Sequence, residues 1–363
     1  MKVVTVLGTR PEIIRLSRII PKLDRSCQHV LVHTGQNYAE VLSDIFFKEL
    51  RVRAPDHSLG VRGDTFGEQI GKILIEVEKV LLRERPDRLL VLGDTNSGLA
   101  AILAKRMGIV VFHLEAGNRC YDDRVPEEVN RRIIDHSSSV LMPYTHRSAA
   151  NLVREGIDRS RIFVVGNPIF EVLEAYRDEI AGSSVLARMR LAPQRYFIVT
   201  MHRAENVDNQ DRLRHLVTAL RRLSEQFGHP VVCSLHPRTR SKMEAFGIAH
   251  DGRDVRFVEP VGFADFVALE RHALCALSDS GTVQEECCIL RVPNVTIRDV
   301  TERPETIEAG SNMLTGMDPG RIVACVEAVL AEPPSWTPPA EYVEPNVSSK
   351  VVKIALGYEW REE

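Results

Sequence analysis

Acidic residues follow two apolar stretches in the first half of the chain. Asp94 and Glu115 each lie just past a short apolar run, and Glu127 lies in the loop or helix start that comes next. A carboxylate beside a cleft loses hydration, so three of them at such positions favour a role in proton transfer. The alternative is structural, with Asp94 and Glu127 capping helices and Glu115 paired with Arg119.

Two strand-to-helix turns have the composition of an anion site. Gly8-Thr9-Arg10 precedes a proline near a helix start, and Ser280-Gly281 opens a second helix. Free backbone N–H groups and the positive end of the helix dipole suit a phosphate or diphosphate there. Arg10 and Arg303 would add positive charge, although an ordinary capped turn with a solvated arginine also fits the first turn.

Several residues of the second half suit a nucleoside and its phosphates. Glu286, about one and a half turns into the helix that follows Ser280, could accept both hydroxyls of a ribose. Phe266 could stack on a base, though a single Phe also fits a hydrophobic core. His202 and His236 each come at the end of an apolar strand.

Alternating strands and helices must position these residues. Short apolar runs and helical periodicity predict a doubly wound α/β fold, whose ligands bind beyond the carboxyl ends of the strands. The first half has expected strands at 3–7, 29–33, 88–93 and 109–112 and helices at 13–23, 65–85 and 97–107. The second half has expected strands at 195–200, 231–235, 255–257, 275–278 and 294–297 and a helix at 211–227.

The length of 363 residues suggests two domains that share a cleft. We expect a first Rossmann-like domain at 1–168, carrying the acidic residues, and a second at 169–340, carrying the nucleotide residues. A proline-rich run at 332–345 reads as a linker. A last helix at 348–360 follows, within a C-terminal segment at 341–363.

Composition narrows the classes of partner. The formal net charge is -3, which provides no general basic field for nucleic acid or an anionic membrane. No apolar stretch is long enough to span a bilayer, and the N-terminus enters a strand without a signal-peptide pattern. We therefore expect a cytoplasmic protein with reduced cysteines.

Missing motifs exclude two kinds of cofactor site. No G-x-G-x-x-G follows either opening strand and no G-x-x-x-x-G-K-[ST] is present, so we expect neither a tightly held nicotinamide nor a P-loop nucleotide. Cysteine spacing fits no zinc site, and His29 and His33 have no obvious third ligand. The prediction is no cofactor and no metal.

Taken together, the motifs resemble the bacterial non-hydrolysing UDP-N-acetylglucosamine 2-epimerase family. Seven motifs occur in the family's order across nearly the whole chain. They are GTRPE at 8–12, GDT at 93–95, HLEAG at 113–117, PEEVNR at 126–131, HR at 202–203, DSGTVQEE at 279–286 and TERPE at 301–305. The resemblance implies a glycosyltransferase-B-like fold of two Rossmann-like domains, with a final helix packed back on the first, and a homodimer.

The resemblance also implies roles for individual residues. Asp94, Glu115 and Glu127 match the carboxylates around the sugar, and His202 matches the essential histidine. The positions matched to UDP are Arg10, His236, Phe266 near the uracil, Ser280, Gly281, Glu286 and Arg303. Arg15 replaces the family's usual lysine, which keeps the charge but not the geometry.

Other segments are similar to a branch of the family that acts on modified UDP-sugars. They are HTGQNY at 33–38, GNRC at 117–120, RVPEE at 124–128, HPRTR at 236–240 and LSDSGT at 277–282. That branch includes the 2-epimerases for UDP-2,3-diacetamido-2,3-dideoxyglucuronate and for a UDP-6-deoxy-hexosamine. The segment at 33–38 also replaces the Q-H stretch of allosteric members, which argues against activation by UDP-N-acetylglucosamine.

Elimination is the chemistry that fits without a nicotinamide. The C2 proton of an N-acetylhexosamine is not next to a carbonyl, but departure of UDP from C1 builds oxocarbenium character and acidifies it. A carboxylate then takes the proton, and UDP adds back after reprotonation on the other face. Domain closure would retain UDP. The alternatives are a hydrolysing 2-epimerase, a glycosyltransferase of the same fold and a UDP-sugar sensor without activity.

Overall fold

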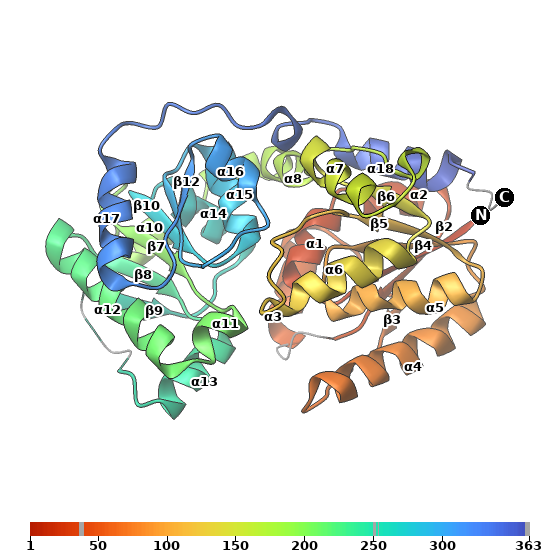
Figure 1. Ribbon diagram of the computed structural model, residues 1–363, viewed down its shortest axis with the longest axis horizontal. Helices are drawn as coiled ribbons and strands as arrows, with labels where there is room; N and C mark the ends of the chain where they lie inside the picture. The colour runs from red at the N-terminus through yellow and green to blue at the C-terminus, as the bar shows by residue number, and fades with distance from the viewer. Residues whose placement is uncertain (36–39, 250–251, 253, 360–363) are drawn as a thin grey trace. The chain divides into compact units, whose positions relative to one another are not determined.

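The computed structural model describes residues 1–35, 40–249, 252 and 254–359. The chain forms two compact units (Figure 1). One comprises Met1–Ala175 together with Ala340–Glu363, and the other comprises Tyr176–Pro339. Each unit is an α/β structure around its own sheet.

The first unit contains a six-stranded parallel sheet in the order β3-β2-β1-β4-β5-β6. The chain order reverses between β1 and β4, so the topological switch point of this Rossmann arrangement lies there. Its strands are β1 (Lys2–Leu7), β2 (Gln28–His33), β3 (His57–Ser58), β4 (Arg88–Leu92), β5 (Val110–Leu114) and β6 (Val140–Met142).

Helices surround this sheet. They are α1 (Arg10–Leu16), α2 (Ile20–Ser26), α3 (Glu40–Glu49), α4 (Phe66–Glu84), η1 (Asn96–Leu99), α5 (Ala100–Arg106), α6 (Pro126–Ser137), α7 (His146–Arg154), η2 (Arg159–Arg161), α8 (Ile169–Ala175), η3 (Ala340–Tyr342) and α18 (Val347–Gly357). The single helix expected at 13–23 is wrong, because the chain forms α1 and α2 there. Pro21 has no N–H and its ring would clash with the carbonyl of Ser17, so a new helix starts with the proline in its first turn.

The second unit repeats the arrangement in the order β12-β11-β10-β7-β8-β9, again with parallel pairs only. Its switch point lies between β7 and β10. Its strands are β7 (Phe197–Thr200), β8 (Val231–Ser234), β9 (Val255–Val258), β10 (Cys275–Ser278), β11 (Asn294–Thr296) and β12 (Asn312–Leu314). Its helices are α9 (Arg177–Ala181), α10 (Val185–Met189), α11 (Ala204–Val207), α12 (Gln210–Phe227), α13 (Pro237–Ala245), α14 (Phe263–Arg271), α15 (Gly281–Leu290), α16 (Pro304–Glu308) and α17 (Pro319–Leu330).

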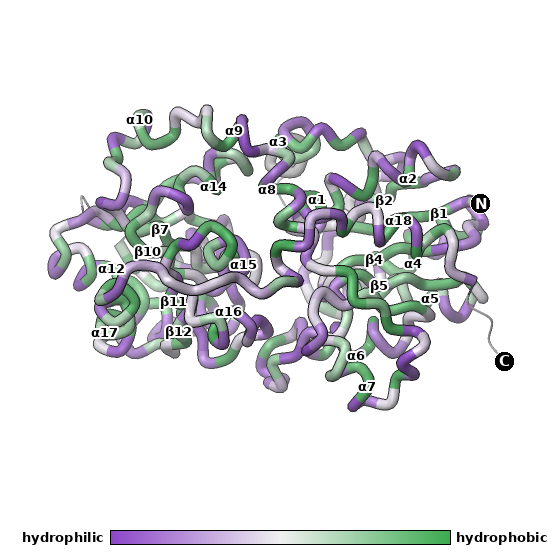
Figure 2. The backbone as a smooth tube through the Cα atoms, turned by 90° about the horizontal axis from the view of Figure 1, so that it is seen from above, coloured by the Kyte–Doolittle hydropathy of each residue, from purple (hydrophilic) through white to green (hydrophobic). Residues whose placement is uncertain are grey.

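The central strands are buried along almost their whole length. All five residues of β4 are buried, and Figure 2 shows much of β4 and β5 in the green of hydrophobic residues. Parallel strands covered by helices on both faces have this composition, because neither face meets water. The predicted doubly wound α/β class is confirmed.

The C-terminal segment packs on the first unit, as expected. Helix α18 contacts α2, where Lys22 Nζ donates to Ser349 Oγ at 2.8 Å. Arg88 of β4 donates to the carbonyl of Ala355. The helix covers 347–357 rather than 348–360, and Trp360 lies outside the described residues. Among the helices of the described part of the chain, none combines the length and hydrophobicity needed to cross a membrane.

Candidate active site

The turn after β1 is tied to the turn after β4 by one buried carboxyl group. Glu12 Oε2 accepts from the backbone N–H groups of Gly8 at 3.0 Å and Thr9 at 2.8 Å, and its Oε1 accepts from the Thr95 hydroxyl at 3.2 Å. Burial raises the pKa of Glu12 to about 7, against the opposing effect of these donors. Arg10 is the first residue of α1 and follows directly on the turn that these hydrogen bonds hold in place. Burial lowers the pKa of the Arg10 guanidinium.

Glu115 follows β5 and is held by three side chains. Its Oε2 pairs with Arg15 Nη1 and accepts from the Tyr144 hydroxyl at 3.1 Å, while its Oε1 accepts from Asn118 Nδ2 at 3.3 Å. The side chain is 6% exposed, and its backbone has a left-handed φ of 73°. Arg15 was predicted to bind substrate, and the structure places its guanidinium against this carboxylate.

Asp94 lies at the adjacent strand end, in contact with a different arginine. Its Oδ2 accepts from Arg131 Nε at 2.8 Å and lies 2.7 Å from Nη2 of the same residue. A Cβ added to Gly93 would lie 3.6 Å from Glu115 Oε2, so the Gly93–Asp94 turn and the Glu115 carboxylate are neighbours. Two of the three predicted carboxylates thus follow the ends of the neighbouring strands β4 and β5.

The helix-capping alternative for Asp94 and Glu127 is wrong. Thr95 is the N-cap of η1 and Val125 is the N-cap of α6. Glu127 is the second residue of α6 and is half-buried.

The proposed pair of Glu115 with Arg119 is also wrong. Arg119 Nη2 lies 2.8 Å from Asp135 and 2.6 Å from Glu155. Asp135 also contacts His113 Nδ1 at 2.8 Å, and His113 Nε2 contacts the carbonyl of Gly93 at 2.9 Å. This buried group supports the turn that carries Asp94.

Sequence reasoning missed the side chains that hold the carboxylates. Glu128 is fully buried and binds Arg131 Nη1 at 2.7 Å. Burial would raise the pKa of Glu128, but the N–H groups of Cys120 and Tyr121 and the charge of Arg131 outweigh that effect and lower it. The i, i+3 spacing of Glu128 and Arg131 was a detectable signal, whereas nothing in the sequence marked Tyr144.

In the second unit, His202 is fixed by an aspartate from the neighbouring strand end. Asp279 is fully buried and accepts from the backbone N–H groups of His202 and Arg203, both at 2.9 Å. Its Oδ1 lies 3.2 Å from His202 Nδ1, so the aspartate orients the imidazole ring. The ring of His236 lies 5.7 Å from that of His202.

The start of α15 adjoins the predicted arginine. Ser280 is the N-cap of α15, and a Cβ on Gly281 would lie 2.8 Å from Glu302 Oε1 and 3.5 Å from Arg303 Nη2. Arg303 is 4% exposed, and its Nε pairs with Glu285. At the end of β10, beside the switch point of the second unit, a helix N-terminus and a buried guanidinium therefore lie together. This combination suits an anionic group.

The two predicted nucleoside residues lie on packed helices. Phe266, in α14, is half-buried, and Glu286, in α15, is 3% exposed. Helices α14 and α15 contact each other.

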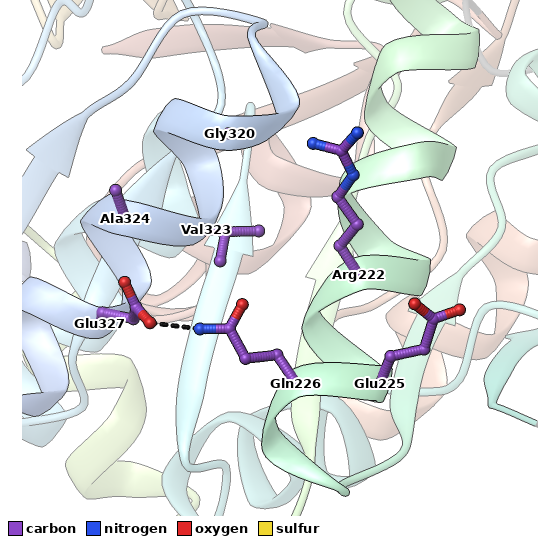
Figure 3. A pocket seen from close by; sticks show the side chains of 7 residues that line it. All are labelled: Arg222, Glu225, Gln226, Gly320, Val323, Ala324 and Glu327. Atoms are coloured by element: carbon purple, nitrogen blue, oxygen red, sulfur yellow. Dashed lines mark hydrogen bonds between the residues drawn. The ribbon is translucent and has the colours of Figure 1, made fainter.

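A shallow hollow between α12 and α17 lies elsewhere in this unit (Figure 3). It is lined by residues such as Arg222, Glu225 and Glu327, and none of the predicted site residues lines it. Within the part of the chain that the structure describes, no cluster of three or more His, Cys, Asp or Glu residues could hold a metal ion.

Fold and site together define an α/β protein of the class that binds nucleotides at the switch points of parallel sheets. The chain belongs to the UDP-N-acetylglucosamine 2-epimerase family, whose model matches residues 21–356. It is accordingly an epimerase, an isomerase by class, and the predicted family is confirmed.

Known proteins similar to this chain include archaeal and bacterial relatives. A UDP-N-acetylglucosamine 2-epimerase of Methanocaldococcus jannaschii is 43% identical over 93% of this chain and 95% of the relative. The crystal structure of a Methanocaldococcus jannaschii UDP-GlcNAc 2-epimerase in complex with UDP-GlcNAc and UDP matches with a TM-score of 0.93 and 42% identity, over 98% of this chain and 99% of that one. A UDP-2,3-diacetamido-2,3-dideoxy-D-glucuronate 2-epimerase of Pseudomonas aeruginosa is 35% identical over 92% of this chain and 93% of the relative.

Proposed function

We propose that this chain catalyses reversible epimerisation at C2 of UDP-N-acetylglucosamine, forming UDP-N-acetylmannosamine without net hydrolysis. The observation that carries the proposal is the position of Asp94 and Glu115 at the ends of the neighbouring strands β4 and β5, where each carboxylate is held by a buried arginine. The family and the 43% identical relative support the substrate. We further propose a cytoplasmic homodimer that needs neither metal nor cofactor.

The proposal assigns the diphosphate to the second unit together with Arg10. The start of α15 at Ser280 and Gly281 provides backbone N–H donors, and the adjoining Arg303 provides charge. His202, oriented through Asp279, would donate from Nε2 to the departing phosphate oxygen. Such prearranged donors stabilise charge that develops as the C1–O bond breaks. Phe266, His236 and Glu286 would hold uracil and ribose.

The carboxylates of the first unit would carry the proton chemistry. When UDP leaves C1, one carboxylate removes the C2 proton and a glycal forms, with the electron pair of the C–H bond closing the C1–C2 double bond. A second acid protonates C2 on the other face, and UDP returns to C1. We assign these two roles jointly to Asp94, Glu115 and Glu127.

A second candidate substrate is UDP-2,3-diacetamido-2,3-dideoxyglucuronate, favoured by the 35% identical relative of that name. The segments that resemble this branch include 33–38, of which 36–38 lie outside the described residues. The two substrates differ at C3 and C6 of the sugar, whereas the proposed chemistry at C1 and C2 is the same.

The test incubates the protein with each UDP-sugar in D2O and follows the products by NMR. Deuterium at C2 of an intact UDP-sugar, with both C2 epimers present, is the expected result. Stoichiometric free UDP and free sugar would instead indicate a hydrolysing enzyme, and the absence of exchange with every UDP-sugar would refute the proposal.

A further inference from the structure

A buried histidine connects β5 to the turn that carries Asp94. Nε2 of His113 lies 2.9 Å from the carbonyl oxygen of Gly93, and its Nδ1 lies 2.8 Å from Oδ1 of Asp135. A carbonyl oxygen can only accept a hydrogen bond, so Nε2 carries a hydrogen and donates it to Gly93. The Gly93 carbonyl belongs to the peptide unit that precedes Asp94. The His113 ring therefore sets the orientation of that peptide unit.

Asp135, on α6, also holds the loop that follows Glu115. Its Oδ2 accepts from the N–H of Gly117 at 3.2 Å and lies 2.8 Å from Arg119 Nη2. Burial would raise the pKa of Asp135, but the hydrogen bonds and charges of His113 and Arg119 outweigh that effect and lower it. An ionised carboxylate accepts at both oxygens, so Nδ1 of His113 donates as well.

One carboxylate thus reaches both of the turns that carry the predicted acids. Asp94 follows β4 and Glu115 follows β5, and these strands are neighbours in the sheet. Asp135 acts on the first turn through His113 and on the second through Gly117. Asp135 is fully buried and His113 is 1% exposed. A displacement of either turn would leave a buried donor or acceptor without its partner, so this polar network allows few alternative arrangements.

The same helix supports Asp94 at two further points. Asn130 Nδ2 donates to the Asp94 carbonyl at 3.0 Å, and Arg131 Nε donates to the Asp94 carboxylate at 2.8 Å. Asn130, Arg131 and Asp135 all belong to α6. The peptide units on both sides of Asp94 and its side chain are therefore held by α6, and the unit before it is held through His113.

We propose that Asp135 is a positioning residue of the epimerisation, which acts through His113 and Gly117 to hold the Asp94 turn and the Glu115 loop in one fixed arrangement. This inference rests on the proposed function, because it takes Asp94 and Glu115 as groups of the proton transfer. A misplacement of about 1 Å at a reacting group can cost about 10²-fold in rate. Loss of the Asp135 contacts should therefore act on kcat.

Two substitutions of Asp135 separate its contacts from its charge. Asp135→Leu removes both acceptors at similar volume, so kcat for deuterium exchange at C2 should fall by about 10²-fold, with little change in KM. In Asp135→Asn the amide NH2 can donate to Nδ1 of His113, while the amide oxygen can accept from the Gly117 N–H. The contacts then persist without the charge, so kcat should stay within about tenfold of the wild type.

Nitrogen-15 NMR of histidine-labelled protein adds a signature that a loss of stability alone would not produce. In the wild type both ring nitrogens of His113 should carry a hydrogen at neutral pH, whereas in Asp135→Asn only Nε2 should carry one. The spectrum of His113→Phe identifies the signals of this ring. A bare ring nitrogen on His113 in the wild type would overturn the inference.

Controls separate positioning from folding. Ile73→Ala, at a fully buried position of α4 outside the proposed site, should lose stability but keep the wild-type kcat. Thermal melts establish that each variant is folded. His113→Phe keeps a ring but donates to neither partner, so its kcat should fall as in Asp135→Leu, and it replaces that variant if Asp135→Leu does not fold.

The outcomes distinguish two failures. If the folded variants Asp135→Leu and His113→Phe keep the wild-type kcat, Asp135 does not position the carboxylates and the inference is overturned. The inference is likewise overturned if Asp135→Asn loses as much kcat as Asp135→Leu, or if Ile73→Ala does. If the wild type exchanges no deuterium with any UDP-sugar, the proposed function itself is wrong and the inference falls with it.

Discussion

At the scale of single residues, two carboxylates of the first unit are each paired with an arginine. Glu115 contacts Arg15 and Asp94 contacts Arg131, so each carboxylate is stabilised in its ionised form by a neighbouring cation. Glu115 also keeps a left-handed backbone, a conformation that non-glycine residues adopt at a cost and that is typical of functional sites. A base must be ionised before it can act, and an adjacent guanidinium favours that form.

Glu115→Gln tests whether Glu115 takes part in the proton transfer. The amide keeps the size of the side chain but cannot accept the C2 proton, so deuterium exchange should fall by about 10²- to 10⁴-fold. The Kd of UDP should change little, since the proposed UDP residues of the second unit are untouched. Glu78→Gln, at an exposed position of α4, is the matched control and should exchange at the wild-type rate. Exchange in Glu115→Gln at that same rate would remove Glu115 from the mechanism.

Glu12 provides a pH-dependent stability prediction. Its pKa is raised by burial from 4.5 to about 7, so its contribution to folding is complete below pH 4.5 and is lost as the pH rises through 7. Relative to Glu12→Gln, the free energy of unfolding of the wild type should fall by about 3 kcal/mol across that interval. Urea titrations of both proteins at several pH values measure the difference. A difference that stays constant with pH would show that the Glu12 carboxyl titrates normally.

At the scale of elements, close packing restricts the backbone conformation of the loop that follows β5. Gly117, in the loop after β5, has a φ of 80°, and a Cβ there would lie 2.3 Å from the carbonyl oxygen of Ser148. Its N–H donates to Asp135 at 3.2 Å. The loop that follows Glu115 is thus fixed against α7 and α6, and only glycine fits at this point.

Gly117→Ala should therefore reduce the free energy of unfolding by at least about 2 kcal/mol, because a left-handed φ and a backbone clash add together. Gly71→Ala is the matched control in the interior of α4, where an added Cβ meets nothing within 4 Å. It should raise stability by about 0.5–1 kcal/mol through lower chain entropy. Denaturant unfolding of both variants measures the contrast, and equal effects would contradict it.

For the whole molecule, the C-terminal segment completes the first unit after the chain has formed the second. Val347, Val351 and Ala355 of α18 are fully buried, and Ser348 N–H donates to Glu171 of α8 at 2.8 Å. The chain thus leaves the first unit at Ala175 and returns to it at Ala340. Both ends of the sequence contribute to one core.

Val351→Ala should lower the free energy of unfolding by about 1–3 kcal/mol, because it leaves a small cavity beneath α18. Lys353→Ala, two residues along on the exposed face of the same helix, should change it by less than about 0.5 kcal/mol. Thermal unfolding monitored by circular dichroism compares the two. A loss in Lys353→Ala as large as that in Val351→Ala would indicate that α18 does not depend on this buried face.

Local pattern was sufficient for most of the fold. The apolar runs of β1, β4, β7 and β10 are recognisable because a strand buried on both faces needs consecutive apolar residues. Short strands were missed, since the three residues of β6 or β12 carry too little pattern, and Pro21 was overlooked as the break between α1 and α2.

The sequence by itself determined which residues stand at strand ends, because strand and turn signals are local. Only the tertiary structure decided what each of them touches. Arg15 and Glu115 are 100 residues apart in the chain, and their ion pair arises from the order of strands in the sheet. Contacts of this kind depend on packing between distant elements, and spacing along the chain does not encode them.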